Sequence, residues 1–315
     1  MSARSTTPAL FLFAGLTLFP MAAHFGPQSY LLSLGARMLI FALAALSLDF
    51  LIGQAALVSF GHAAYLGIGA YAVVLSSMAG IDDVLLQAVV AAAAAALFAY
   101  ATGYVSLRAS GVYYIMSTLA FGQMLYFLFV SLSALGGDDG YTLERRSNLF
   151  GAPWLKGDLS FYFLCLVVLV FAYLLLTRVA QSRFGRALNA IRQNPLRARA
   201  LGFKPLPLQL VACVISGAIA SLAGVLVANQ SEFVAPAILS WQRSGELLVM
   251  TILGGVGSLW GAVAGALVYL TLEETLSLYT EQSYLVIGPV LVIVALFGRR
   301  GLAGLVTSPP AAGAP

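Results

Sequence analysis

The sequence predicts an all-α polytopic membrane protein with about eight to ten transmembrane helices. The chain of 315 residues is 61% hydrophobic and 9% charged, with a mean hydropathy of +0.94, whereas soluble domains carry about 25% charged residues. Its apolar runs are continuous and lack the alternation of apolar and polar residues that marks a membrane β-barrel. This composition excludes a soluble fold and indicates a helical bundle in a bilayer.

Ten apolar stretches approach the length that a helix needs to cross a membrane. In chain order they cover residues 9–25, 30–50, 57–79, 84–107, 112–135, 159–180, 207–229, 244–258, 259–279 and 283–298. The eighth is short and only glycines separate it from the ninth, so we expect a half-helix there. The sequence thus predicts one transmembrane domain over 9–300, with a tail over 1–8, an outer loop over 136–158, a basic loop over 181–206 and a flexible tail over 301–315.

The charges assign the basic loop and both ends of the chain to the cytoplasm. From Arg178 to Lys204 the chain carries seven basic residues and no acid. In the ten-span arrangement eleven of the sixteen basic residues share the side of this loop, and Arg243 is counted with the few on the outer side. Short loops rich in Lys and Arg stay in the cytoplasm. The first apolar run is accordingly interpreted as the uncleaved signal of a multi-span protein.

Two glycine-rich segments interrupt the apolar pattern, one in each half of the chain. The first contains Gly53, Gly61, Gly67 and Gly69, and the second contains Gly254, Gly255, Gly257, Gly261 and Gly265. One interpretation is close helix packing, because the last three glycines are spaced four apart on one helix face. The other is a pair of broken helices that line a path, because paired interruptions in corresponding halves point to a transport route.

Few polar side chains lie within the expected spans, and each is a candidate for the path. The ionisable ones are Arg37, Asp49, His62 and Glu246, and the hydrogen-bonding ones include Ser59, Tyr71 and Gln123. We expect Asp49 to be reached by water near the cytoplasmic end of its span, or to pair with a base on a neighbouring helix. We expect His62 to bond a carbonyl of a broken helix. The uncharged groups line the path or hold helices together.

The basic loop carries the signals of one short helix. Asn194 suits the N-cap, Pro195 suits the first helical position and Gly202 suits the left-handed position after the end. The sequence therefore predicts a helix over 195–201 on the membrane surface, exposing Leu196, Ala200 and Leu201. A short basic helix of this kind rests on anionic lipid or docks in a groove of a protein partner. The rigid caps favour docking on a protein.

The chain has no phosphate-binding loop of its own. No Gly-x-x-x-x-Gly-Lys-Ser/Thr run is present, and neither lysine, Lys156 or Lys204, follows a glycine. Cys165 and Cys213 stand alone in apolar runs, without the spacing of a metal site. The net charge of +4 originates in the basic loop and does not indicate nucleic acid. We expect no catalytic residue, metal or cofactor here, with ATP and Mg²⁺ bound by partner subunits.

Four segments, taken in order, carry a family resemblance. They are SFGHAAYLGIGAY (59–71), GVYYIMSTLAFGQ (111–123), GRALNAIRQNPLRARALG (185–202) and VMTILGGVGSLWGAVAGA (249–266). Together they resemble the permeases of branched-chain amino-acid ABC importers, specifically the LivM-type family. The resemblance implies a type II-like importer bundle with two related halves in the bacterial inner membrane, moving solute from periplasm to cytoplasm.

The resemblance also implies sites and partners. The segment 185–202 matches the coupling helix that docks on the ATPase, which implies contacts by Gly185, Arg186, Ala187, Asn194, Pro195, Leu196, Ala198, Leu201 and Gly202. The translocation path is expected along Asp49, Gly53, Ser59, Gly61, His62, Gly67, Gly69, Tyr71, Gln123, Gly254, Gly255 and Gly257. The implied partners are a LivH-type second permease, two ATPase subunits of LivG and LivF type, a periplasmic substrate-binding protein and the bilayer.

Departures from the family pattern leave related cargoes open. Many relatives have Gly-Gln at Ala56-Leu57, Asn at Asp49 and Glu at Gln123, and Asp49 with Leu57 is similar to the urea, amide and aromatic-acid branches. We expect a small polar or amphipathic solute, first a branched-chain or related amino acid, with urea, short amides or aromatic carboxylates as alternatives. An ion-coupled secondary transporter is the alternative class, although it usually needs buried acids beyond Asp49. The sequence contains no catalytic motif that would indicate an intramembrane enzyme.

Overall fold

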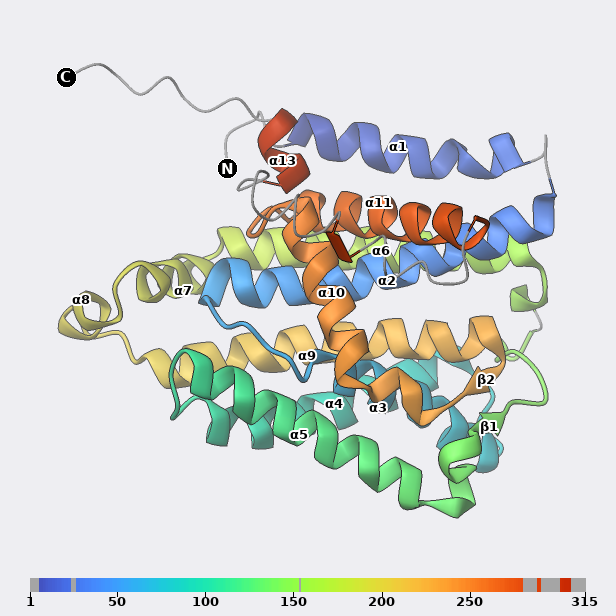
Figure 1. Cartoon of the computed structure of the whole chain (residues 1–315), viewed down its shortest axis with the longest axis horizontal. Coiled ribbons are helices and arrows are strands. Elements are labelled where there is room, and N and C mark those ends of the chain that lie inside the picture. The colour runs from blue at the N-terminus through green and yellow to red at the C-terminus, as the bar shows by residue number, and fades with distance from the viewer. Residues whose placement is uncertain (1–5, 24–26, 153, 280–287, 290–300, 307–315) are drawn as a thin grey trace.

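The computed structural model describes residues 6–23, 27–152, 154–279, 288–289 and 301–306. Within them the chain forms a bundle of long helices that run along one axis (Figure 1). Five helices are long and apolar enough to cross a membrane: α2 (Gln28–Ala55), α4 (Val84–Ser106), α5 (Val112–Ser131), α6 (Asp158–Gln181) and α9 (Pro205–Ser231). The predicted all-α polytopic class is therefore confirmed.

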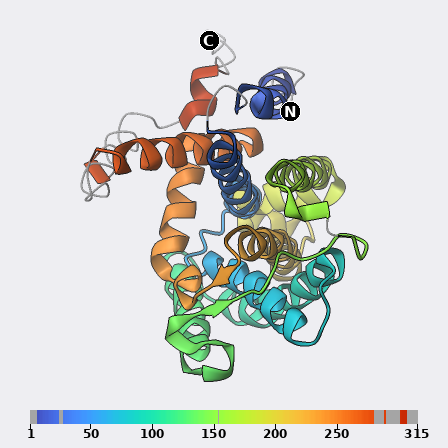
Figure 2. The same ribbon diagram turned by 90° about the vertical axis from the view of Figure 1, so that its right-hand side faces the viewer.

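The remaining apolar helices are shorter or bent. α10 (Trp241–Gly254) and α11 (Leu259–Ser277) pass the same test only as a pair, and the chain bends by 116° between them. Figures 1 and 2 both show α10 running across the direction of α2. α1 (Thr6–Ala23) and α3 (His62–Met78) are shorter apolar helices. The eighth expected span is thus the half-helix α10, as predicted, whereas most of the tenth, 283–298, lies outside the described residues.

Two helices, α2 and α9, form the centre of the bundle. α3 and α4 pack against α9, and α6 and α11 pack against α2. Small residues permit these close approaches, since a Cβ at Gly224 would collide with the carbonyl of Leu66 and a Cβ at Gly69 with that of Ser221. The apolar faces of α4 and α5 remain largely exposed, as expected for helices at the lipid boundary.

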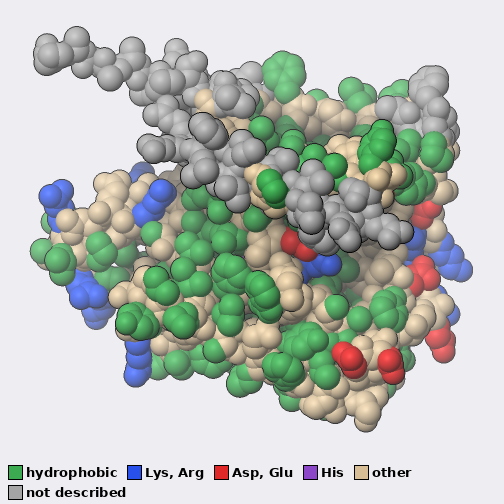
Figure 3. Space-filling view, viewed as in Figure 1, with side chains coloured by type: hydrophobic (Ala, Val, Ile, Leu, Met, Phe, Trp, Pro, Cys, Tyr) green, Lys and Arg blue, Asp and Glu red, His purple; other side chains and the backbone are tan. Residues whose placement is uncertain are grey.

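The two ends of the bundle differ in charge. One end carries the basic helices α7 (Arg183–Gln193) and α8 (Pro195–Ala200), visible as the blue side chains at the left of Figure 3. At the other end Arg145 pairs with Asp82 at 2.8 Å, and Arg146 pairs with Asp158 at 3.0 Å. The short elements are η2 (Ser133–Leu135), η3 (Gly137–Asp139), η4 (Trp154–Lys156), η5 (Pro236–Leu239), α13 (Gly301–Val306) and the antiparallel strands β1 (Tyr141–Thr142) and β2 (Phe233–Val234).

Candidate translocation path and coupling site

The first break in the helical pattern lies between α2 and α3, where residues 56–61 are not helical. Ala56 takes the left-handed conformation (φ 55°) after the end of α2. The chain then turns back along the bundle, because His62 Nε2 lies 2.8 Å from Ser47 Oγ, about two helical turns before the end of α2. α3 therefore begins beside the interior of α2 and not at its end, as expected of a broken helix.

Side chains from two other helices hold this first break. Thr118 Oγ1 on α5 accepts from the Phe60 amide at 3.1 Å, and Ser244 Oγ on α10 accepts from the Ala63 amide at 3.0 Å. Gly61 is required by close approach, since a Cβ there would collide with the Thr118 carbonyl. His62 bonds the Ser47 hydroxyl and no carbonyl of a broken helix, which corrects the expectation, and its Nδ1 has no partner among the described residues.

The second break is the turn of residues 255–258 between α10 and α11. Gly255 and Gly257 have φ of 105° and 85°, which side chains rarely tolerate. Ser258 then caps α11 by accepting from the Gly261 amide at 3.3 Å. Gly257 precedes α11 and does not share its face, which corrects the expected spacing of three glycines. Gly261 and Gly265 do pack closely, because a Cβ on either would collide with the backbone of α10.

A buried carboxylate joins the second break to α2. Asp49 is fully buried, and its Oδ1 accepts from the Gly257 amide at 2.7 Å. The sequence predicted contact with water or an ion pair with a neighbouring base. The structure instead closes the carboxylate off from solvent, forms no ion pair with it among the described bases and uses it to bind the backbone of a turn. Oδ2 has no described hydrogen-bond partner.

The basic loop reaches the same place through Arg192, near the end of α7. Its Nη1 donates to the Gly53 carbonyl on α2. Gly53 in turn packs on the second break, since a Cβ there would lie 2.5 Å from Gly257 Cα. A chain of contacts therefore runs from the basic loop through Gly53 to Gly257. Arg192 is a site residue that the sequence did not reveal. The apolar spacing of Leu188 and Ile191, which α7 buries, indicates the helix that positions it.

The predicted short helix is present as α8, one residue shorter than expected. Asn194 Oδ1 accepts from the Arg197 amide at 2.9 Å, Pro195 occupies the first turn and Gly202 has φ of 87°. Leu196 and Leu201 are 76% and 70% exposed. Not every residue of the implied docking set is accessible. Arg186, Asn194, Pro195, Leu196, Leu201 and Gly202 are exposed, whereas Gly185, Ala187 and Ala198 are buried against the protein's own helices.

The residues expected along the path fall into three groups. Asp49, Gly53, Gly254, Gly255 and Gly257 meet at the second break. Ser59, Gly61 and His62 lie at the first break, and Gln123 follows Gly122, the α5 residue that approaches Gly61. Gly67, Gly69 and Tyr71 lie on α3, where Gly67 faces Leu239 and Tyr71 stacks on Phe129 with ring centroids 4.0 Å apart. The described contacts of the third group are packing contacts, while the buried Tyr71 hydroxyl has no described hydrogen-bond partner.

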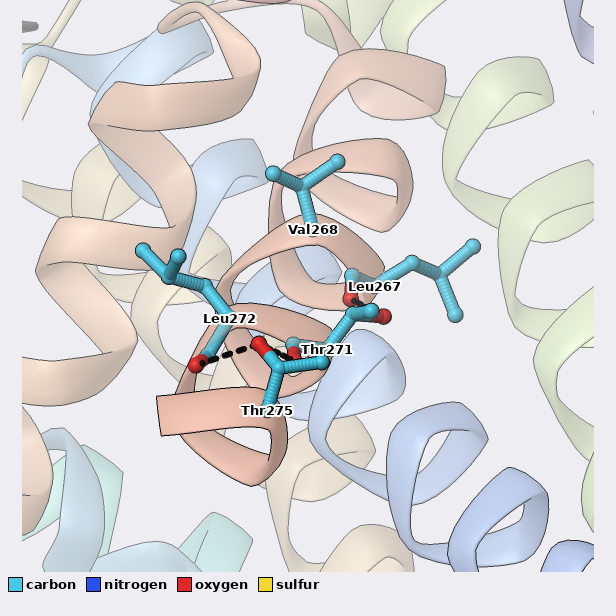
Figure 4. Close-up of a pocket in the computed structure, with 5 residues that line it drawn as sticks. All are labelled: Leu267, Val268, Thr271, Leu272 and Thr275. Atoms are coloured by element: carbon cyan, nitrogen blue, oxygen red, sulfur yellow. Dashed lines mark hydrogen bonds between the residues drawn. The ribbon is translucent and has the colours of Figure 1, made fainter. Parts of the chain in front are cut away.

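The polar groups at the first break are closed off in this structure. Ser59, His62 and Ser244 are all buried. An open groove of about 340 Å³ lies instead on α11 between Leu267, Val268, Thr271, Leu272 and Thr275 (Figure 4). Its threonine hydroxyls bond carbonyls of their own helix, so the groove offers no free polar group. The described residues contain no cluster of His, Cys, Asp and Glu suited to a metal.

Comparisons with known proteins identify the family. A family model described as branched-chain amino acid transport system, permease component, matches residues 30–295. The chain is 28% identical over 290 residues to the high-affinity branched-chain amino acid transport system permease protein LivM of Escherichia coli (strain K12), covering 84% of this chain and 68% of that protein. It is 27% identical over 281 residues to the corresponding protein BraD of Pseudomonas aeruginosa, covering 84% and 91%.

A more distant similarity extends to another import system. The chain is 27% identical over 165 residues to the autoinducer 2 import system permease protein LsrC of Photorhabdus laumondii, covering 50% of this chain and 48% of that protein. No solved structure matches the chain significantly. The family model spans most of the sequence, and the long apolar helices fit it. The chain therefore belongs to the family of branched-chain amino acid ABC transporter permeases, as a multi-pass permease subunit of the inner membrane.

Proposed function

We propose that this subunit passes branched-chain or related amino acids from periplasm to cytoplasm, driven by separate ATPase subunits that dock on its basic loop. The observation that carries the proposal is the contact chain from α8 to the second break. α8 is a rigid, capped and exposed helix, and α7, which precedes it, hydrogen-bonds the backbone of Gly53. A displacement of the loop by a partner therefore acts directly on the break between α10 and α11.

The surface of α8 supports docking on a protein. Leu196 and Leu201 expose most of their apolar surface on a strongly basic loop. Ala198 faces inward and anchors the helix, so the two leucines point away from the bundle on a fixed support. Exposed apolar residues on a rigid element, surrounded by charge, are typical of a recognition surface for a protein groove. In this proposal ATP and Mg²⁺ bind only the partner subunits.

The remaining partners follow from the family. We propose a LivH-type second permease, ATPases of LivG and LivF type and a periplasmic binding protein, with both chain termini in the cytoplasm. α1 runs antiparallel to α6, with Phe13 against Tyr173, so its start lies at the end of the bundle that carries the basic loop. The positive-inside rule then supports a cytoplasmic location for that end.

An ion-coupled transporter is less well supported by the geometry. Such a mechanism needs an acid at mid-membrane that exchanges a cation with water. Asp49 is closed off and bound to the Gly257 amide, and Glu246 is paired with Arg243, so neither acid is free to exchange a cation in this structure. Uptake that persists without ATP but stops with an uncoupler would nevertheless establish that class.

Docking is tested by co-purification of the full complex. L196D and L201D should abolish recovery of the ATPase subunits, because each places a charge on the exposed apolar surface of α8. F150D is the matched control, since Phe150 is 80% exposed in the outer loop at the opposite end. Equal ATPase recovery for L196D/L201D and wild type would refute docking at α8. A chain that never co-purifies with an ATPase would refute the whole proposal.

The cargo is tested separately on the binding protein. Thermal-shift measurements with leucine, urea, short amides and benzoates should give the largest stabilisation with leucine, because ligand binding to the native state raises the unfolding temperature. Stabilisation of the binding protein by urea, amides or benzoates alone would show that the transporter carries one of those solutes in place of leucine.

A further inference from the structure

An ion pair on α10 lies beside the middle of the long helix α2. Arg243 Nη1 and Glu246 Oε2 are 2.5 Å apart. The guanidinium carbon of Arg243 lies 5.3 Å from the ring centroid of Phe41, which is near the middle of the 28-residue helix α2. The adjacent Ser244 bonds the start of α3. The charge count along the sequence assigns Arg243 to the outer side, whereas its contact with Phe41 lies beside the middle of α2.

The pair is partly exposed at the surface of the subunit. The side chains of Arg243 and Glu246 retain 28% and 14% of their accessible surface. Both charged groups therefore reach the accessible surface of the described part of the subunit. Charges at this depth are costly against hydrocarbon and face water-filled cavities or protein interiors. By this principle the α10 face borders protein or water rather than lipid.

Further charges lead from the outer end of α2 to this pair. Arg37 lies one helical turn before Phe41 on α2 and pairs with Glu273 and Glu274 of α11, each at 3.9 Å. The Tyr30 hydroxyl donates to Glu274 at the outer end. Acidic and basic groups thus alternate along one face, with loose pairs outside and a close pair at mid-depth. An entering solute with both charges meets a complementary partner at each level.

We propose that Arg243 and Glu246 bind the zwitterionic head group of an amino acid in transit. This inference rests on the proposed function and names the chemistry of its path. The planar guanidinium matches a carboxylate and pairs with it through two parallel hydrogen bonds, while the Glu246 carboxylate accepts from the ammonium. One ion pair is exchanged for two, so no charge at mid-depth is left unpaired. An aromatic carboxylate would satisfy only Arg243 and leave Glu246 bare.

The test compares neutralised ion pairs in the complete transporter, reconstituted with its ATPases and leucine-binding protein. R243Q/E246Q should lower the maximal rate of leucine uptake about tenfold or more, because two charged contacts to the cargo are lost. ATP hydrolysis stimulated by the loaded binding protein should stay within about twofold of wild type, because docking and nucleotide chemistry lie elsewhere. R145Q/D82N, which neutralises an outer pair of similar length, should leave uptake unchanged.

A direct probe covers the case in which R243Q/E246Q does not assemble. Photo-activatable leucine, loaded on the binding protein, should label the 241–254 segment of the wild-type complex during turnover. Uptake near the wild-type rate in R243Q/E246Q, or labelling confined to other segments, would overturn the binding site. A wild-type complex that does not transport leucine would instead refute the proposed function, so the two failures are distinguishable.

Discussion

The two breaks in the helical pattern are built differently. The first, residues 56–61, is held by Thr118 of α5 and Ser244 of α10, which bond the backbone on both sides of Gly61. The second, residues 255–258, is held by Asp49 and is the one that contacts Gly53, the residue to which Arg192 donates. The first break is therefore fixed by packing between neighbouring helices. The second break is contacted by the basic loop, so a movement of that loop can displace it.

The glycines of the two breaks serve different physical needs. Gly61 has φ of −102°, which any residue adopts, and it is needed because α5 approaches too closely for a side chain. Gly257 has φ of 85°, and a Cβ there would meet only ordinary contacts. Substitutions should therefore separate a steric effect at the first break from a backbone effect at the second.

The largest expected loss of stability is at the first break. G61A should lower the free energy of unfolding by about 2 kcal/mol or more, because the new methyl group collides with the Thr118 carbonyl and overpacking is destabilising. Thermal unfolding of the detergent-purified protein measures this. G15A is the control, since nothing lies within 4 Å of its Cβ in α1. Equal melting temperatures for G61A and G15A would mean that the first break is not tightly packed.

The next effect concerns the carboxylate that holds the second break. D49N should retain the acceptor for the Gly257 amide, whereas D49A leaves this amide unpaired. D49A should therefore be less stable than D49N by about 1 kcal/mol, the usual value of one such hydrogen bond. The unfolding temperatures of both variants are compared with wild type. A D49N variant as unstable as D49A would show that the negative charge, and not the acceptor, holds the turn.

A smaller effect on stability tests the backbone of the second break. G257A and G111A should each cost about 1–2 kcal/mol, because both residues have positive φ. Only G257A should also lower uptake, since Gly111 has nothing within 4 Å and lies away from the contact chain. Uptake and unfolding are measured on the same preparations. Loss of uptake in both variants would show that uptake falls with stability in general and does not depend specifically on the second break.

The smallest change in stability is expected at Arg192. R192Q removes one hydrogen bond to Gly53 and should cost about 1 kcal/mol or less. It should nevertheless reduce uptake per ATP hydrolysed, because the loop loses its link to the second break. R178Q removes the same charge from the exposed end of α6 and is the control. If both variants keep the wild-type ratio of leucine moved to ATP hydrolysed, Arg192 does not transmit loop movement.

The sequence predicted features that depend on neighbouring residues. The continuous apolar runs predicted the helices, and Asn194, Pro195 and Gly202 predicted the caps of α8, because capping acts within one turn of the chain. The four family segments predicted the permease family, which the comparison over residues 30–295 confirms. The burial of Gly185, Ala187 and Ala198 escaped prediction, since a motif does not show which of its faces packs inward.

The sequence by itself determined the membrane class, the two interruptions of the spans and the short capped helix, because each follows from composition or from local backbone preference. Only the tertiary structure decided which groups meet. Asp49 binds an amide 208 residues away, Arg192 binds a carbonyl 139 residues away, and Arg243 lies over Phe41 near the middle of α2. Such partners depend on how α2, α7 and α10 pack, and packing arises from the sum of many weak contacts that no single segment specifies.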